Sequence, residues 1–306
     1  MSSSAKDVIV QQPAIFSDVG ARERGPGISA RLKKLGVLAR QNPLGTIGLV
    51  VILVFGLAAV FAPLIAPYDP NGFTGVRQEN ISSAHIFGTE RLGRDIFSRV
   101  VYGGRISLSV AFISVIGGAS VGMIFGIISG YFGGLIDSLI QRAVDTAIAF
   151  PALLLLLIIV QSVGPSFKTI VFALSLAVIP GVTRVIRGAV LSEKNNQYIE
   201  SARASGAWAP RILFRHILPN VVALGIIIMT TILGTIILAE AALSFLGLGI
   251  PNAVSWGKDV ADSRTYPYHI PAAIFPGGAI TLTVLGFNLL GDSIRDIADP
   301  RLRGSR

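Results

Sequence analysis

Long runs without a charged residue are the feature of this sequence that most restricts its fold. One run extends from Leu44 to Ala66 and another from His216 to Ala239. A helix rises about 1.5 Å per residue, so either run can cross the roughly 30 Å hydrocarbon core of a bilayer. Because lipid offers no partner for backbone polar groups, only helices and closed barrels span membranes. The runs therefore predict membrane-spanning helices.

Composition favours the same class. Hydrophobic residues make up 52% of the 306-residue chain and charged residues only 14%, whereas soluble domains carry about 25% charged residues. The net charge is +9, but a nucleic-acid-binding protein would show a basic face with little apolar bulk. We expect an all-α integral membrane protein that lies in lipid and binds no nucleic acid.

Six transmembrane helices are expected, at residues 44–66, 106–132, 138–162, 168–190, 219–246 and 272–291. An even number places both termini on one side, which also holds most of the Lys and Arg residues and is therefore assigned to the cytoplasm. The expected parts are a partly disordered cytoplasmic N-terminal segment (1–43), the first transmembrane helix (44–66), an extracytoplasmic segment (67–105), a core of five helices (106–291) and a cytoplasmic tail (292–306).

The polar segment 191–218 separates the fourth and fifth expected spans. It must lie at a membrane face, because unpaired loop backbone is not tolerated in lipid. Residues 200–204 are helix formers, Gly206 interrupts them, and Ile212 and Leu213 follow. This order predicts a short helix on the membrane surface.

Five residues between positions 200 and 219 follow one pattern, glutamate-x-alanine, a glycine four residues on and a distal Leu-Pro: Glu200, Ala202, Gly206, Leu218 and Pro219. The pattern resembles the EAA loop of bacterial ABC importer permeases, although Ser201 stands where the family usually has alanine. The resemblance implies that the segment, including Arg203 and Ile212, contacts an ATPase.

Further segments resemble the second permease subunit of dipeptide and oligopeptide importers: residues 92–108, 142–153, 243–251, 255–257 and 287–303. The resemblance implies a type I ABC importer permease fold with a cytoplasmic coupling helix, in the bacterial inner membrane. It implies as partners a homologous second permease subunit, two ATPase subunits and an extracytoplasmic solute-binding protein. Nickel-chelate and glutathione importers share these segments, so the substrate stays open among peptides, nickel chelates and glutathione-like solutes.

A glycine stripe is expected on the second span. Gly118, Gly122, Gly126, Gly130 and Gly134 recur every four residues, which places them on one helix face. Small residues let helix backbones approach closely in membranes. We expect a packing face, toward a helix of this chain or of a partner permease, rather than a surface that recognises substrate.

Charges within the spans need partners. Glu240 must pair, protonate or face water, and two interpretations stay open, a site on the translocation path and a helix interface. Arg142 and Asp145 are one turn apart and are expected to neutralise each other. Pro151 is expected to kink the third span.

Two expectations concern the outer segments. Asp95 is expected to form a solvated surface pair with Arg91 or Arg99. Aromatic residues of a later outer loop are expected to form a membrane-interface belt, with docking of a solute-binding protein as the alternative: Trp256, Tyr266, Tyr268 and His269.

Several chemistries have no sequence signal. The chain has no cysteine, its three histidines are far apart, and it has neither a phosphate-binding G-x-x-x-x-G-K-[ST] loop nor a G-x-S-x-G elbow. We expect a non-enzymatic subunit that binds no cofactor, with ATP and Mg²⁺ bound by partner ATPase subunits. The alternatives are an autonomous secondary transporter or channel, which usually carries inverted repeats and ionisable clusters within the membrane, and a non-transporting scaffold.

Overall fold

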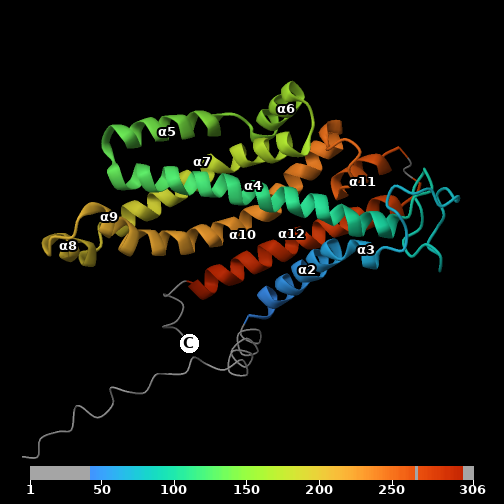
Figure 1. The fold of residues 1–306 in the computed structure, drawn as a ribbon, viewed down its shortest axis with the longest axis horizontal. Coiled ribbons are helices and arrows are strands. Elements are labelled where there is room, and N and C mark those ends of the chain that lie inside the picture. The colour runs from blue at the N-terminus through green and yellow to red at the C-terminus, as the bar shows by residue number, and fades with distance from the viewer. Residues whose placement is uncertain (1–41, 266–267, 299–306) are drawn as a thin grey trace, which may run out of the picture. The chain divides into compact units, whose positions relative to one another are not determined.

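The computed structural model describes residues 42–265 and 268–298, and the regular elements of these residues are helices (Figure 1). They are α2 (Pro43–Val60), α3 (Ala62–Ile65), α4 (Ile96–Phe132), α5 (Gly134–Ala149), α6 (Ala152–Val163), α7 (Phe167–Lys194), α8 (Gln197–Ala204), α9 (Ala209–Ile212), α10 (Leu218–Leu243), α11 (Trp256–Ser263) and α12 (Pro271–Ala298). Two π-helical turns, η1 (Leu213–Ile217) and η2 (Ser244–Leu248), flank α10. Most of the expected N-terminal segment and the end of the tail lie outside the described residues.

Among the described residues, five helical stretches are long and apolar enough to cross a membrane: Pro43–Val60, Ile96–Phe132, Phe167–Lys194, Pro210–Leu248 and Pro271–Ile297. A sixth crossing requires α5 and α6 together, and these helices meet at 87°. Phe150, between them, has an extended backbone because a following proline disfavours the helical conformation. The span expected at 138–162 is therefore two helices joined by a sharp break, rather than one kinked helix.

Four glycines of the regular series lie where α4 meets α7: Gly118, Gly122, Gly126 and Gly130. A Cβ atom added to Gly126 would lie only 2.8 Å from the Thr183 carbonyl oxygen and the Ile186 Cβ. Real side chains do not approach so closely, so glycine allows the two backbones to meet. The helix that the stripe contacts belongs to this chain.

Gly134 is not part of the contact, contrary to the expected fifth position of the stripe. α4 ends at Phe132, and Gly133 and Gly134, with φ of +68° and +57°, turn the chain into α5. A Cβ atom on Gly134 would meet nothing within 4 Å. A four-residue spacing marks one face only while the helix continues, and this left-handed turn ends it.

Ion pairs join α5 to α7. Arg187 donates from Nε and Nη2 to the two Asp137 carboxylate oxygens at 2.6 Å each, and Arg184 pairs with Asp145. The expected pairing of Arg142 with Asp145 is therefore wrong. Helix spacing allows that pair, but α7 runs beside α5 and supplies a different arginine to the carboxylate.

The irregular segment 67–95 is held onto the start of α4. Asp95 caps the helix, with Oδ2 accepting from the backbone nitrogen and the hydroxyl of Ser98 at 2.7 Å each. Its other oxygen lies 2.9 Å from His85 Nδ1, and the residue is 0% exposed. The surface ion pair expected for Asp95 is wrong, because capping and the histidine use the buried carboxylate.

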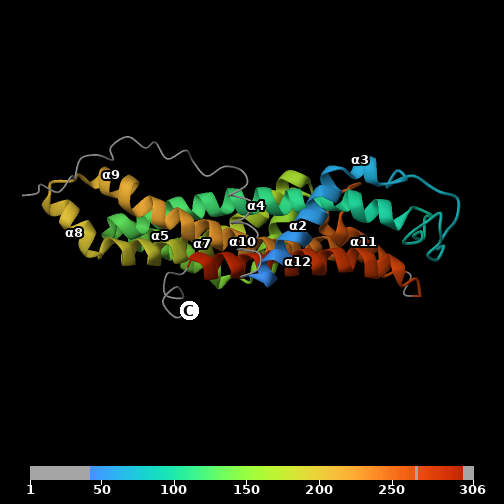
Figure 2. The ribbon, with the colours of Figure 1, turned by 90° about the horizontal axis from the view of Figure 1, so that it is seen from below.

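The bundle of described helices has two distinct ends. α8 and α9 lie at one end, and α11 and residues 67–95 lie at the other (Figure 1). Figure 2 shows the same separation from a second direction, with α2 crossing α12, which it contacts. We refer to these as the α8 end and the α11 end.

Replacing Gly126 with Leu is expected to lower the midpoint of thermal unfolding in detergent, because the new side chain must push α4 away from α7. Overpacking of this kind costs about 1–3 kcal/mol. The matched control is Gly56→Leu on α2, where a Cβ atom meets nothing within 4 Å. Equal midpoints for the two variants would contradict the close helix contact.

Candidate functional site

The α8 end carries a short helix that closes in a glycine turn. α8 ends at Ala204, and Gly206 follows with φ of +81°. The Gly206 nitrogen donates to the Arg203 oxygen at 2.9 Å, and the Ala207 nitrogen donates to the Ala202 oxygen at 3.0 Å. These two bonds form a Schellman motif, so the turn requires a residue that tolerates a left-handed backbone.

The polar residues of α8 face outward. Glu200, Ser201 and Arg203 are exposed, and Ala202 is half-buried. On the other face, Ile199 is 0% exposed and belongs to the hydrophobic core. α8 therefore offers charges of both signs on its surface while one isoleucine holds it to the bundle.

Three residues expected in the loop lie instead in the continuous helical stretch that runs from α9 through η1 into α10: Ile212, Leu218 and Pro219. Ile212 is 1% exposed and ends α9, and η1 connects it to Leu218. Proline lacks a backbone donor and clashes with the preceding turn, which the wider π-helical turn accommodates. The segment expected as a loop at 191–218 is thus largely helical, since α7 continues to Lys194.

Glu193 ties α7, α8 and α10 together, and no sequence signal marked it. Its carboxylate accepts hydrogen bonds from Asn196 Nδ2 at 3.0 Å, Asn220 Nδ2 at 2.6 Å and the Tyr198 hydroxyl. Burial and the bond to Glu193 raise the pKa of the Tyr198 phenol, which keeps the phenol protonated as a donor. α8 is therefore attached to the ends of two long helices.

At the opposite end, Trp256 fixes α11 against α2 and α4. Its side chain is 1% exposed, Nε1 donates to the Val100 oxygen at 2.7 Å, and its ring meets Phe55 edge-on at 5.6 Å between centroids. A Cβ atom on Gly103 or Gly104 would lie 3.0 Å from the indole, so glycines make room for the ring.

The expected interface belt is wrong for two of its four residues. Trp256 and His269 are buried, whereas Tyr268 is 97% exposed. Tyr266 lies outside the described residues. An aromatic residue in a polar loop can fill a gap between helices, and the local sequence gives no sign of the helices that will cover it.

Glu240 lies among hydroxyl groups and is 1% exposed. Oε1 accepts from Ser244 Oγ at 2.9 Å, and Oε2 accepts from Ser107 Oγ at 3.2 Å. Ser107 Oγ also accepts from the Trp256 backbone nitrogen at 3.3 Å. The carboxylate thus links α4, α10 and the start of α11. This geometry favours the helix-interface interpretation of Glu240.

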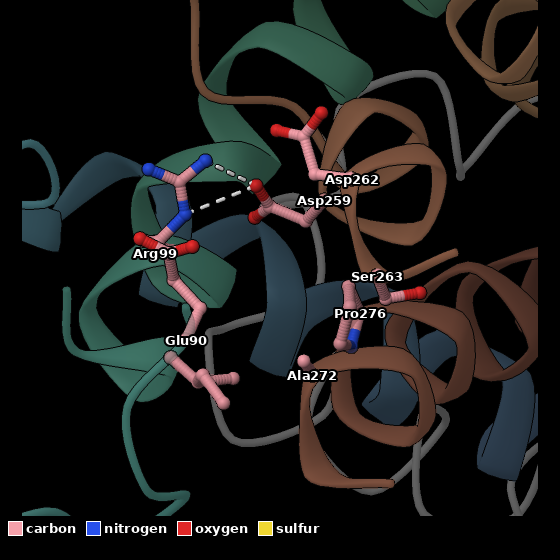
Figure 3. Close-up of a pocket in the computed structure, with 8 residues that line it drawn as sticks. Glu90, Arg99, Asp259, Asp262, Ser263, Ala272 and Pro276 are labelled. Atoms are coloured by element: carbon pink, nitrogen blue, oxygen red, sulfur yellow. Dashed lines mark hydrogen bonds and ion pairs between the residues drawn. The ribbon is translucent and has the colours of Figure 1, made fainter. Parts of the chain in front are cut away.

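Arg99 of α4 and Asp259 of α11 form a buried ion pair (Figure 3). Arg99 Nε lies 3.0 Å from Asp259 Oδ1, Nη2 contacts the same oxygen, and Nη1 donates to the Pro70 oxygen at 3.0 Å. Burial raises the pKa of Asp259, and the charge of Arg99 opposes that rise. The pair joins α11, α4 and the segment 67–95 at one point.

Two family models match the chain. Residues 122–304 match the model of the binding-protein-dependent transport system inner membrane component. Residues 39–85 match the N-terminal transmembrane domain of oligopeptide transport permease C. The first match covers more than half of the chain and includes both α8 and α11.

Curated relatives are similar over most of their length. The dipeptide transport system permease protein of Alkalihalophilus pseudofirmus is 42% identical over 86% of this chain and 88% of its own. A putative peptide transport system permease protein of Brucella suis biovar 1 is 41% identical, with 84% and 88% covered. The glutathione transport system permease protein of Pectobacterium atrosepticum is 41% identical, with 86% and 89% covered.

Replacing Arg99 with Met is expected to destabilise the fold by about 3–5 kcal/mol, because Asp259 would keep a buried charge without its partner. The double variant Arg99→Met with Asp259→Leu should regain much of the loss, since both charges are then gone. Thermal unfolding of both variants in detergent checks this. A double variant no more stable than the single one would contradict the assigned pairing.

Proposed function

The chain belongs to the family of binding-protein-dependent transport system inner membrane components, and on that premise we propose that it is a permease subunit of an ATP-driven importer of short peptides. It is a multi-pass protein of the inner membrane. We assign both termini and the α8 end to the cytoplasm, because the surplus of Lys and Arg supports that orientation. The α11 end then faces the extracytoplasmic side.

The observation that carries the proposal is the attachment of α8. Its outward face presents Glu200 and Arg203, and its inward contacts through Ile199 and Glu193 connect it to the core and to α7 and α10. When a groove on an ATPase holds this helix, movement of the ATPase is passed to the long helices, which then move as rigid bodies. Rigid-body movement is a usual form of coupled conformational change. Family membership favours this over an autonomous secondary transporter or channel.

Family membership supports a set of partners for this chain. We propose a homologous second permease subunit beside this chain, two ATPase subunits at the α8 end and a solute-binding protein at the α11 end. The sequence has no phosphate-binding loop. ATP and Mg²⁺ are therefore assigned to the ATPase subunits, and this chain contributes transport without catalysis.

The substrate class follows from the relatives. Their names specify dipeptides, peptides and glutathione, which is itself a tripeptide. We assign short peptides with free carboxylates to this chain, and the glutathione permeases support glutathione as a second candidate. Glu240 is assigned to the helix interface, since its two hydroxyl donors come from neighbouring segments of the packed bundle.

Replacing Gly206 with Arg is expected to abolish ATP-driven uptake and the stimulation of ATP hydrolysis in the reconstituted transporter. The left-handed turn would be strained, and a long cation would lie beside α8 at the ATPase contact. Gly206→Asn is the matched control, because asparagine tolerates the same backbone and should retain most activity. Insertion in the membrane should be unchanged in both variants. Normal uptake by Gly206→Arg would refute the coupling role.

A further inference from the structure

A pocket of about 610 Å³ opens at the α11 end. Residues from four parts of the chain line it: the loop before α4, the turn before α7, the end of η2 and α11. Ligand pockets in proteins typically measure about 300–1,000 Å³. The size therefore suits a short peptide or part of one.

The pocket has a surplus of positive charge. Its cationic residues are Arg91, Arg94, Lys258 and Arg264, and its acidic residues are Glu90 and Asp262. Arg94 Nε lies 3.8 Å from Glu90 Oε1, and the Arg264 guanidinium lies 4.2 Å from the centre of the Phe245 ring. Arg94 and Arg264 are therefore already engaged by neighbouring side chains.

Lys258 is another cation of the pocket lining. It lies in the first turn of α11, half-buried, with its backbone nitrogen donating to Ser255 Oγ at 3.3 Å. No hydrogen bond or ion pair involves its side-chain amine in the described part of the chain. Within the described residues, a half-buried lysine whose amine has no hydrogen bond or ion pair is well placed to bind an incoming carboxylate.

Gly247 and Gly249, at and just after the end of η2, form part of the pocket lining. Gly247 has φ of +85°, and a Cβ atom on Gly249 would lie 2.7 Å from Ser244 Oγ. Ser244 donates to Glu240, so this part of the lining continues directly into the buried network of α10. A ligand in the pocket would thus touch the end of a membrane-spanning helix rather than a detached loop.

We propose that this pocket receives the C-terminal carboxylate of the transported peptide after the binding protein releases it, with Lys258 as the group that binds the carboxylate. The inference rests on the proposed function and adds to it a site and the chemical group that the site recognises. The net positive lining, the ammonium of Lys258 and the size of the pocket all favour a small anionic group.

The test uses the complete transporter in proteoliposomes with saturating peptide-loaded binding protein. Lys258→Gln should lower the maximal rate of uptake of a free-acid peptide about tenfold. This factor corresponds to the free energy of one charge-assisted hydrogen bond. Lys258→Arg should keep most of the rate. The matched control is Lys168→Gln, which removes an exposed cation of α7 that does not line the pocket and should leave the rate unchanged.

A second substrate tests the contribution of the carboxylate independently of the rest of the peptide. With a C-terminally amidated peptide that the binding protein still carries, Lys258→Gln should cause little loss. Equal losses for acid and amide, or an unchanged maximal rate for both, would overturn the proposal. So would a variant that only raises the half-saturating concentration of binding protein, because Lys258 would then serve docking. Absence of ATP-driven peptide uptake by the unaltered transporter would instead refute the proposed function.

Discussion

The close contact of α4 with α7 is the constraint on which the other arrangements depend. Glycines such as Gly126 let the two backbones meet in a membrane, where apolar surface alone does not drive helices together. α7 leads at one end to Glu193 and the attachment of α8. α4 leads at the other end to Arg99 and Ser107, which hold α11 and Glu240. One packed pair of helices therefore connects the α8 end to the α11 end.

The two ends differ in how their polar groups are used. At the α11 end, Arg99, Asp259 and Glu240 are buried and matched with partners, which fixes α11 against the bundle. At the α8 end, Glu200 and Arg203 are exposed while an isoleucine beneath them is buried. Exposed charges on a firmly attached helix suit a surface that must bind another subunit and transmit its movement.

Local sequence patterns predicted local structure correctly, but they did not predict which residues distant in the sequence contact one another. The glycine spacing indicated a close helix contact and Gly206 indicated a turn, because each depends on a few neighbouring residues. The partner of Asp145 and the burial of Trp256 depend on helices distant in the sequence, so the nearest complementary residue was the wrong choice for Asp145. For Glu193, likewise, the partners that bind it come together only in the folded bundle.

The proposed transport function depends most on contact between α8 and an ATPase subunit. The chain has no cysteine, so a single one can be placed at Arg203 on α8 or, as the matched site, at Asp262 on α11. Each variant is labelled with a photoactivatable maleimide in the assembled transporter, beside the cysteine-free parent. We expect a cross-link to the ATPase from position 203 and none from position 262. A cross-link to the ATPase from position 262 alone would contradict the proposed contact.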